Sequence, residues 1–391
     1  MTAVRPGIEV LCEDRVRLVR GARIGLLCHP ASVDRDLRHA AERLADAGAE
    51  VVRLFAPEHG ATGGAQDMVP VDEGRDPVTG LPVVSLYGDT EDTLAPRPEH
   101  LEGLDALVVD LQDVGARYYT FAATAIRALA PCAAAGVRAI ACDRPNPLGG
   151  NLVEGNTVEP AYRSFVGELP VPQRHGMTIG ELVRFAARVR GIEADLEVVP
   201  CEGWHREEDF PATGLPWVLP SPNMPTPDTA LVYPGTCLLE GTNLSEGRGT
   251  TRPFEIVGAP WLDPRALVAA LEAEALPGVR FRPLVFVPTF HKHAGKPCGG
   301  IQLHVFDRRA FRPVLTGLAV VIAARRLAPE RFAWRTEPYE FVSDRLAFDL
   351  LAGTGAWRQA IEEGASAREI AAGFRVHEEE QRARIAELGL Y

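Results

Sequence analysis

Several signals that mark common classes of protein are missing from this sequence. The seven cysteines form no Cys-x-x-Cys pair and lie far apart, as buried thiols do in proteins of a reducing compartment. No apolar run approaches the length of about 20 residues that a membrane-spanning helix needs, and residues 1–7 lack the apolar core of a secretory signal. Provided that no leader has been removed, these absences predict a cytoplasmic protein without a membrane anchor.

The sequence also lacks the motifs of several common active sites. Neither a Gly-x-Gly-x-x-Gly fingerprint nor a Gly-x-x-x-x-Gly-Lys-Ser/Thr loop is present, and His29-Pro30-Ala31-Ser32 follows the first apolar run instead. There is no Gly-x-Ser-x-Gly elbow of a serine hydrolase and no His-Glu-x-x-His motif of a zinc hydrolase. We therefore expect no dinucleotide or other organic cofactor, and no metal.

Composition and charge are those of a globular, acidic protein. The length of 391 residues exceeds the roughly 250 to 300 at which a single core stops growing, so two domains are expected. Hydrophobic residues make up 46% and charged residues 24%, which argues against long disordered segments. The 41 basic and 53 acidic residues give a formal net charge of -12. With its basic residues scattered, the chain is expected to bind a small polar substrate rather than nucleic acid.

The first 160 residues alternate short apolar runs with helical patterns. The apolar runs lie at residues 24–28, 51–55, 83–87, 106–111 and 137–142, and helices are expected at residues 34–47 and 119–135. Strands this apolar, without alternation and separated by helices, are typical of a parallel sheet covered on both faces. We therefore predict an α/β fold in which residues 1–160 form a Rossmann-like domain with a parallel sheet.

After residue 160 the sequence becomes rich in proline and turns, especially at residues 211–234. This stretch is too irregular to continue the doubly wound pattern, although residues 196–199 are β-like. Later strands are expected at residues 280–287 and 300–305, and helices at residues 178–190, 264–275, 312–326, 356–361 and 367–388. Residues 161–391 are thus predicted to form a second, smaller α+β domain.

One carboxylate is singled out by its position at the end of the apolar run 51–55. Glu58 lies in Pro57-Glu58-His59-Gly60, where a buried strand reaches the edge of the sheet. Because an open α/β sheet binds its ligand at the carboxyl ends of its strands, Glu58 is the first candidate for chemistry. The alternative is an exposed turn, in which Pro57 and Gly60 break the strand and the glutamate is solvated.

Three further segments carry groups that suit a hydroxyl-rich ligand. Residues 110–119 and 143–150 follow apolar runs and supply carboxylates, arginines, amides and tyrosines, which bind hydroxyls or cover an apolar sugar face. Residues 235–252 hold two glutamates, two arginines and four glycines, a composition that brings backbone close to another group. The alternatives are that the acids cap helices and pair with the arginines, and that the third segment is a solvated loop.

A metal site is a weaker hypothesis. His291-Lys292-His293 would place two imidazoles on one side of a strand, and His59 and His175 would add two more, but no known ligand spacing occurs. Isolated histidines are more often hydrogen-bonded structural residues.

Four of these segments resemble one family closely. It is the family first described as domain of unknown function 1343 and now associated with exo-β-N-acetylmuramidases of the NamZ type, glycoside hydrolase family 171. The matching motifs are Pro57-Glu58-His59-Gly60, Asp110-Leu111-Gln112-Asp113-Val114-Gly115-Ala116-Arg117-Tyr118-Tyr119-Thr120-Phe121, Asp143-Arg144-Pro145-Asn146-Pro147-Leu148-Gly149-Gly150 and Leu239-Glu240-Gly241-Thr242-Asn243-Leu244-Ser245-Glu246-Gly247-Arg248-Gly249-Thr250. The resemblance extends over nearly the whole chain, from residue 7 to the terminal helices. It implies that the Rossmann-like domain, residues 1–160, is catalytic and that residues 161–391 form an auxiliary domain that contributes to the active-site cleft.

The resemblance implies release of N-acetylmuramic acid, or a related amino sugar, from the non-reducing end of peptidoglycan fragments during cell-wall recycling. Glu58 matches the family's leading catalytic candidate, and we expect it to be the acid of a carboxylate pair. For the second carboxylate we consider Asp113, Glu240 and Glu246. The residues expected to contact substrate are His29, His59, Gln112, Arg117, Tyr118, Tyr119, Asp143, Arg144, Asn146, His175, Asn223, Asn243, Arg248, Thr250 and Arg252.

Two departures from the family pattern bear on location and substrate. Many relatives carry a secretion leader, and relatives often have Thr-Asn-x-Thr-Gly where this chain has Cys28-His29-Pro30-Ala31-Ser32. Among the four arginines Arg117, Arg144, Arg248 and Arg252, we expect one to pair with the lactyl carboxylate of muramic acid. Two other functions stay open: a metal-dependent hydrolase, and a sugar-binding protein that kept the crevice and lost catalysis.

Overall fold

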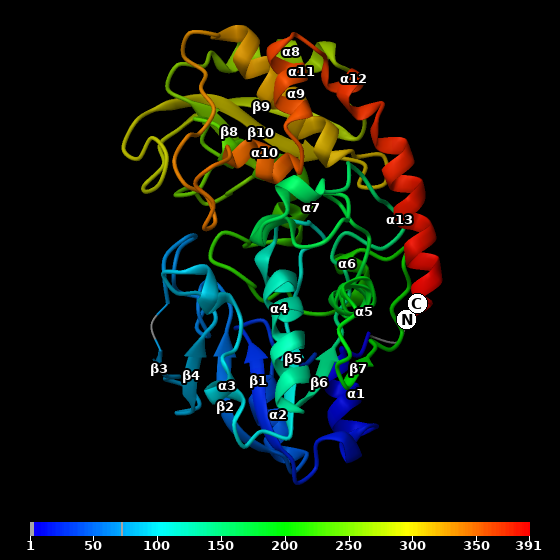
Figure 1. The fold of residues 1–391 in the computed structure, drawn as a ribbon. Helices are drawn as coiled ribbons and strands as arrows, with labels where there is room; N and C mark the ends of the chain where they lie inside the picture. Colours follow the sequence, from blue (N-terminus) through cyan, green and yellow to red (C-terminus); the bar gives the residue numbers. More distant parts are fainter. Residues whose placement is uncertain (1–3, 72) are drawn as a thin grey trace.

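The computed structural model describes residues 4–71 and 73–391. Figure 1 shows two lobes, one built on a large sheet and the other on a small sheet with helices packed around it. The strands of the large sheet end at the side that faces the second lobe (Figure 1). The polar segments that follow these strands therefore lie where the two lobes meet.

The large sheet has seven strands in the order β3-β4-β2-β1-β5-β6-β7. Its strands are β1 (Arg23–Cys28), β2 (Glu50–Ala56), β3 (Gly74–Arg75), β4 (Pro82–Ser85), β5 (Ala106–Asp110), β6 (Arg138–Cys142) and β7 (Leu196–Val199). All neighbours are parallel except β3, which pairs antiparallel with β4 at one edge. The strand order reverses between β1 and β5, which is the topological switch point of a doubly wound sheet.

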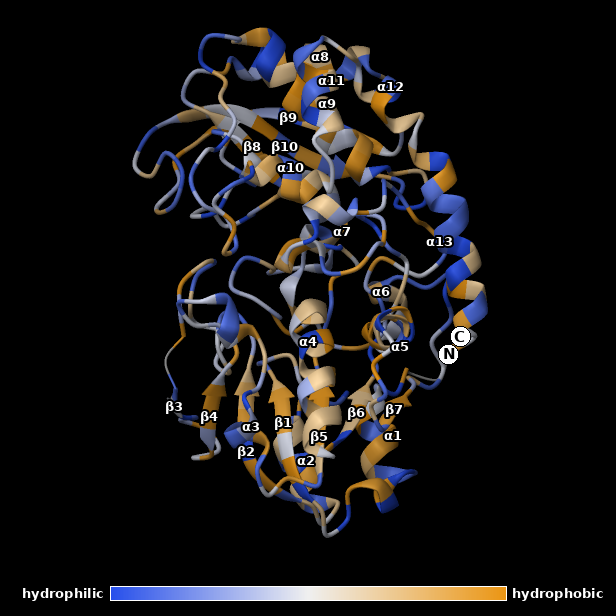
Figure 2. Ribbon diagram, viewed as in Figure 1, coloured by the Kyte–Doolittle hydropathy of each residue, from blue (hydrophilic) through white to orange (hydrophobic). Residues whose placement is uncertain are grey.

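Helices cover both faces of this sheet, and β1 divides its side chains between the two resulting cores. Ile24 and Leu26 pack with α1 (Gly7–Glu13) and α2 (Ala40–Asp46). Leu27 points to the other face, with α4 (Thr120–Ala135) and α5 (Ile179–Arg190), while the short α3 (Pro98–Leu101) packs against α4. Figure 2 shows the strands as largely hydrophobic ribbons, as expected for a sheet buried on both sides.

The second lobe contains a three-stranded antiparallel sheet in the order β8-β10-β9. Its strands are β8 (Ile256–Ala259), β9 (Val279–Phe286) and β10 (Cys298–Val305). The remaining helices are α6 (Phe210–Thr213), α7 (Pro227–Thr236), α8 (Pro264–Ala273), α9 (Pro313–Leu327), α10 (Ala347–Ala352), α11 (Ala356–Glu362), α12 (Ala367–Ala371) and α13 (Phe374–Leu388).

The last helix returns to the first lobe. Figure 1 shows α13 running down one side of the molecule, and it packs against α5. Beyond it, the Tyr391 hydroxyl donates to Asp143 Oδ2 over 2.7 Å, at the end of β6. The two lobes are therefore joined by a helix as well as by the chain crossing.

The predicted fold class is confirmed: a Rossmann-like, mainly parallel sheet is followed by a smaller α+β part. The expectation that the doubly wound pattern stops before residues 196–199 is wrong, because β7 pairs parallel with β6. The predicted boundary between two domains at residue 160 concerns folding units, which strand pairing alone does not define. It stays a prediction.

Three local expectations were also wrong. The helix predicted at residues 34–47 begins only at Ala40, because Asp34 Oδ1 accepts from the backbone N–H of Asp36 and Arg38 and closes a turn instead. The helix predicted at residues 367–388 is interrupted between α12 and α13. The Pro-rich stretch contains α7, whose Pro227 occupies the first turn, where no backbone donor is needed.

Candidate active site

Glu58 lies in a tight turn directly after β2. His59 and Gly60 both have positive φ, 71° and 82°, so the chain reverses as soon as it leaves the sheet. The side chain of Glu58 is buried, with 5% of the residue exposed, so the alternative of a solvated turn glutamate is wrong. Its Oε1 accepts from the Met68 backbone N–H over 3.1 Å, and its Oε2 accepts from Thr120 Oγ1 over 2.7 Å.

Glu58 also lies beside the start of α4, since Thr120 is the first residue of that helix. The N-terminus of a helix carries partial positive charge and stabilises an anion next to it. One carboxyl oxygen of Glu58 is thus held by a hydroxyl at a helix N-terminus, and the other by a backbone N–H of the loop after β2. This geometry suits a carboxylate that carries charge.

Glu58 forms part of the wall of a cavity of about 480 Å³ that lies between the lobes. The cavity is lined by residues from both parts of the chain. Those predicted from the sequence are Glu58, His59, Tyr118, Tyr119, Asn223, Glu240 and Arg248. Those not predicted are Asp67, Thr120, Val166, Ser221, Met224, Tyr233, Phe254, Tyr339 and Glu340.

Aromatic rings form one wall of the cavity. The ring of Tyr233 lies edge-on to those of Tyr118 and Tyr119, with centroids 5.9 Å away in each case. Phe254 continues the wall at 4.7 Å from Tyr233, and the hydroxyl of Tyr118 donates to the Pro234 carbonyl. Such a wall offers an apolar surface to the face of a sugar ring, while the polar groups of the cavity remain for its hydroxyls.

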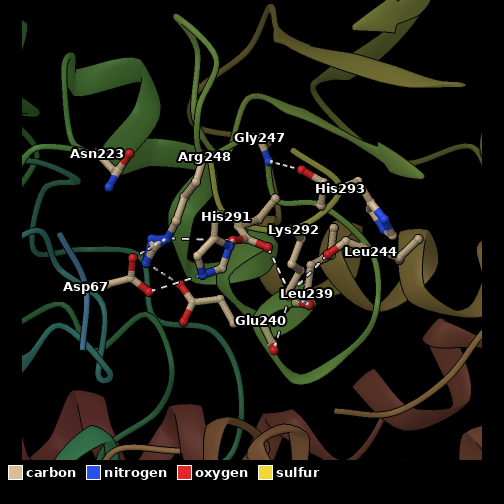
Figure 3. A network of polar contacts seen from close by, with 12 residues as sticks. Asp67, Asn223, Leu239, Glu240, Leu244, Gly247, Arg248, His291, Lys292 and His293 are labelled. Atoms are coloured by element: carbon tan, nitrogen blue, oxygen red, sulfur yellow. Dashed lines mark hydrogen bonds and ion pairs between the residues drawn. The ribbon is translucent and has the colours of Figure 1, made fainter. Parts of the chain in front are cut away.

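Arg248 is the centre of the charged wall (Figure 3). Its Nη2 donates to Glu240 Oε1 over 2.8 Å, and its Nε lies 3.4 Å from Asp67 Oδ1 and 3.6 Å from Glu246 Oε1. The guanidinium also lies 5.0 Å from the centroid of Phe254. Among the described residues, Nη1 has no hydrogen-bond partner although it is buried. Arg248 therefore lines the cavity and keeps one buried donor without a partner.

Three acidic and three basic groups balance one another in this network. Lys292 Nζ lies 3.0 Å from Glu246 Oε2, and His291 Nδ1 lies 3.1 Å from Glu246 Oε1. Burial opposes ionisation, but Arg248 and His291 lower the pKa of Asp67 to about 2. Contacts with Asp67 and Glu246 raise the pKa of His291 to about 9, so its imidazole is charged at neutral pH.

Glu240 and Glu246 differ in their electrostatic surroundings. Burial would raise the pKa of Glu246, yet Lys292 and its other cationic neighbours lower it below the usual range. Burial raises the pKa of Glu240 in spite of Arg248. Both oxygens of Glu240 are engaged, because the Tyr339 hydroxyl donates to Oε2 over 2.6 Å. Glu246 itself does not line the cavity.

The segment 291–293 does not have the predicted strand geometry. It lies in a loop after β9, and His291 and His293 both have positive φ, 65° and 59°. His293 Nε2 lies 2.7 Å from the Asn243 carbonyl oxygen, so its ring points away from Glu246. The glycines of the segment 235–252 pack against protein backbone rather than a ligand. A Cβ on Gly249, for example, would lie 2.7 Å from the backbone of Phe290.

Asp113 and His175 form a buried pair outside the cavity lining. His175 Nε2 lies 3.3 Å from Asp113 Oδ2, and this oxygen accepts from the Gly115 backbone N–H over 2.6 Å. His29 is buried at the end of β1, where its Nε2 accepts from the Gln112 backbone N–H over 2.8 Å. Burial lowers the pKa of His29 well below its usual value. At the switch point of the sheet, His29 is thus bonded to the backbone that follows β5.

Two predicted arginines also make contacts within the protein. Arg144 forms a bidentate ion pair with Asp110, with distances of 2.6 and 2.7 Å, at the end of β5. Arg117 donates to three backbone carbonyls, those of Asn156, Val171 and Leu351. Burial lowers the pKa of Arg117 to about 10. Neither guanidinium lines the cavity that contains Glu58.

The remaining predicted contacts likewise lie outside that cavity. Asp143 accepts from the Thr178 hydroxyl and the Gly180 backbone N–H. Asn146 and Asn243 donate to the backbone carbonyls of Met177 and Arg331. The Gln112 side chain donates to the Asp113 and Pro145 carbonyls, Thr250 donates to the Gly247 carbonyl, and Arg252 is half exposed beside Glu255.

The part of the chain that the structure describes contains neither a metal-binding cluster nor a membrane-spanning helix. No group of three or more His, Cys, Asp or Glu side chains is arranged to hold a metal ion at residues 4–71 and 73–391. No helix of the described chain has the length and apolar character needed to cross a membrane.

Comparisons with known proteins agree along the whole chain. Residues 24–228 match the family model for the N-terminal part of exo-β-N-acetylmuramidase NamZ, and residues 231–391 match the model for its C-terminal part. The chain is 46% identical over 368 residues to the peptidoglycan β-N-acetylmuramidase NamZ of Bacillus subtilis (strain 168), covering 94% of this chain and 86% of that protein.

Two crystal structures of DUF1343 family proteins from Bacteroides fragilis NCTC 9343 have the same fold. One has a TM-score of 0.88 at 32% identity and covers 100% of both chains. The other has a TM-score of 0.78 at 28% identity and covers 100% of this chain and 99% of that one.

Proposed function

The chain belongs to the exo-β-N-acetylmuramidase NamZ family, and we propose that the cavity containing Glu58 is its active site. The protein is an exo-acting glycosidase that releases N-acetylmuramic acid from the non-reducing end of peptidoglycan fragments. The observation that carries this assignment is the buried, doubly hydrogen-bonded Glu58 in a cavity with one aromatic and one charged wall. A carboxylate at such a place is what cleavage of a glycosidic bond requires.

We propose Glu58 as a catalytic carboxyl, and the contacts of the three predicted partners argue against each of them as the second one. Asp113 is bound to His175 and Gly115, and Glu246 is bound to Lys292 and His291. Glu240 lines the cavity, but both of its oxygens are occupied by Arg248 and Tyr339. Glu240 therefore suits the positioning of Arg248 better than proton transfer.

The activity is tested with the whole protein and a chromogenic aryl β-N-acetylmuramide. We expect release of the chromophore together with free N-acetylmuramic acid, and release of N-acetylmuramic acid from the disaccharide N-acetylmuramyl-N-acetylglucosamine. Because the enzyme is exo-acting, products larger than one sugar are not expected from the non-reducing end. Absence of turnover on both substrates would support the alternative of a sugar-binding protein that has lost catalysis.

Arg248 is the proposed contact for the lactyl carboxylate of muramic acid. Among the four arginines considered from the sequence, it alone lines the cavity, and its Nη1 is free. Replacing it by lysine keeps the charge but removes the planar fork that binds a carboxylate. We expect Arg248→Lys to weaken inhibition by N-acetylmuramic acid by about 10- to 100-fold, with inhibition by N-acetylglucosamine changed little.

Arg252 supplies the matched control for this prediction, because it lies in the same segment, is half exposed and faces away from the cavity. Arg252→Lys should leave both inhibition constants unchanged. If Arg248→Lys weakened the two sugars equally, Arg248 would be a general contact and the recognition of the lactyl group would lie elsewhere.

We propose a cytoplasmic location and a role in recycling wall fragments. All seven cysteines are free, and six of them are buried, which suits a reducing compartment. Fractionation of the producing cells with marker enzymes tests the location. Recovery of the protein with the extracellular or wall fraction would contradict it.

A further inference from the structure

A turn between α9 and α10 brings an additional carboxyl to the cavity. Tyr339 and Val342 exchange two backbone hydrogen bonds of 2.9 Å, so Glu340 and Phe341 are the two central residues of a tight turn. Both have positive φ, 46° and 67°. Two-residue turns of this kind normally use Asn-Gly, because at positive φ the Cβ of most other residues lies too close to the backbone carbonyl. Such strain persists only where the surrounding structure holds it, often at functional sites.

Contacts with the first lobe hold this turn in place. Phe341 packs edge-on against Tyr87, with ring centroids 5.5 Å apart, and against Phe165 at 6.4 Å. The Tyr87 hydroxyl donates to Glu340 Oε2 over 3.0 Å. Tyr87 follows β4, the strand next to β2, after which Glu58 is placed. The turn therefore brings a carboxyl of the second lobe to the cavity that Glu58 lines.

The surroundings of Glu340 favour its neutral form. The residue is 5% exposed, and no lysine, arginine or histidine of the described chain forms an ion pair with it. Burial and the charge of Glu58 raise the pKa of Glu340 well above its usual value, and Glu240 and Asp67 act in the same direction. Its Oε1 accepts no hydrogen bond from any residue that the structure describes and remains available to a ligand.

Glu58 and Glu340 thus share a cavity in contrasting environments. Glu58 has a donor on each oxygen and lies at a helix N-terminus, whereas Glu340 has one tyrosine donor and carboxylates nearby. Two titratable groups whose environments favour opposite protonation states are the usual arrangement of an acid and its charged partner. Glycoside hydrolysis uses such a pair on either side of the scissile bond.

We propose that Glu340 is the second catalytic carboxyl, the proton donor to the glycosidic oxygen, with Glu58 as the charged carboxylate and Tyr87 positioning Glu340. This inference rests on the proposed function. It gives Glu58 a different role from the proton donor expected from the sequence. As the C1–O bond breaks, its electron pair stays on the glycosidic oxygen, which takes the Glu340 proton and leaves as a hydroxyl. Water then supplies hydroxide to C1 and its remaining proton to the carboxyl pair, which again holds one proton.

The test compares two substrates that differ in their need for a proton. The leaving sugar of N-acetylmuramyl-N-acetylglucosamine is a poor leaving group, whereas 2,4-dinitrophenolate leaves without protonation. For Glu340→Gln we expect kcat/KM to fall by about 1000-fold on the disaccharide and by less than about tenfold on the 2,4-dinitrophenyl muramide. Tyr87→Phe should reproduce the same selective loss in a weaker form, with KM nearly unchanged.

The same segment offers a matched control in Glu337, whose side chain is 73% exposed. Glu337→Gln should behave as the wild type on both substrates. Full activity of Glu340→Gln on the disaccharide, or an equal loss on both substrates with unchanged thermal unfolding, would overturn the proposal. Turnover by the wild-type protein distinguishes these outcomes from a failure of the proposed function itself, in which neither substrate is cleaved.

Discussion

Glutamine in place of Glu58 is expected to lower kcat/KM by about 1000-fold on both the disaccharide and the 2,4-dinitrophenyl muramide. Unlike the loss of a proton donor, removal of the charged carboxylate affects every leaving group, because positive charge develops at C1 in each case. The amide is isosteric and can still accept from Thr120 through its oxygen. The measurement is steady-state kinetics on the two substrates, with thermal unfolding to establish that the variant is folded.

A glutamate outside the site provides the comparison for Glu58. Glu42 is exposed on α2, and Glu42→Gln should retain wild-type rates. If Glu58→Gln kept turnover within about tenfold of the wild type, which is below the usual effect of a catalytic acid or base, Glu58 would not take part in the chemistry.

Methionine in place of Arg144 is expected to destabilise the protein by about 3–5 kcal/mol, because it leaves the buried Asp110 carboxylate without its partner. The residues are 5% and 0% exposed and share two hydrogen bonds, so water cannot replace the lost contact. Urea unfolding of the purified variant measures the change. The double variant Asp110→Asn/Arg144→Met should recover part of the loss, since no buried charge remains.

An exposed ion pair of the same sheet serves as the reference for Arg144. Arg138 and Asp195 are paired over 2.7 Å near the start of β6, with 43% and 62% of their side chains exposed. Arg138→Met should therefore change the free energy of unfolding by less than about 1 kcal/mol. A stable Arg144→Met protein with a greatly raised KM would instead restore Arg144 as a substrate contact.

The sequence predicted the central strands well because each is an apolar run bounded by turn residues. β1, β2, β5 and β6 were predicted to within two residues, since strands covered on both faces carry few polar positions that could obscure the apolar run. The four-residue β8 was missed, because its Ile256-Val257-Gly258-Ala259 is too short to show a period. The break before α13 was missed because the predicted helical pattern continues across residues 372–373.

The candidate site was predicted only where chemistry follows directly from a strand end or a glycine-rich segment. Glu58, Tyr119 and Arg248 were found in this way, and all three line the cavity. Arg144 and Arg117 have the same sequence character but pair with groups that only the folded chain brings near them. Sequence position gives no indication whether an arginine will face a ligand or a buried carbonyl.

Asp67 and Glu340 could not have been found by that reasoning. Asp67 lies in the long connection between β2 and β3, well beyond the end of β2, and Glu340 lies between α9 and α10, so neither stands directly at a strand end. The only local signal for Glu340 is the pair of positive φ angles at residues 340 and 341, which is a property of the structure and not of the composition.

The network around Glu246 also gives the molecule an internal chemical reporter. The sequence contains two lysines, Lys292 and Lys296. Lys292 donates to Glu246 and to the carbonyls of Leu239 and Leu244, whereas Lys296 is exposed. An acylating reagent that requires a free, accessible amine therefore modifies one of the two lysines, Lys296, in the folded chain. The second becomes reactive only when the charged wall of the cavity opens, so amine labelling measures the opening of this wall separately from unfolding elsewhere.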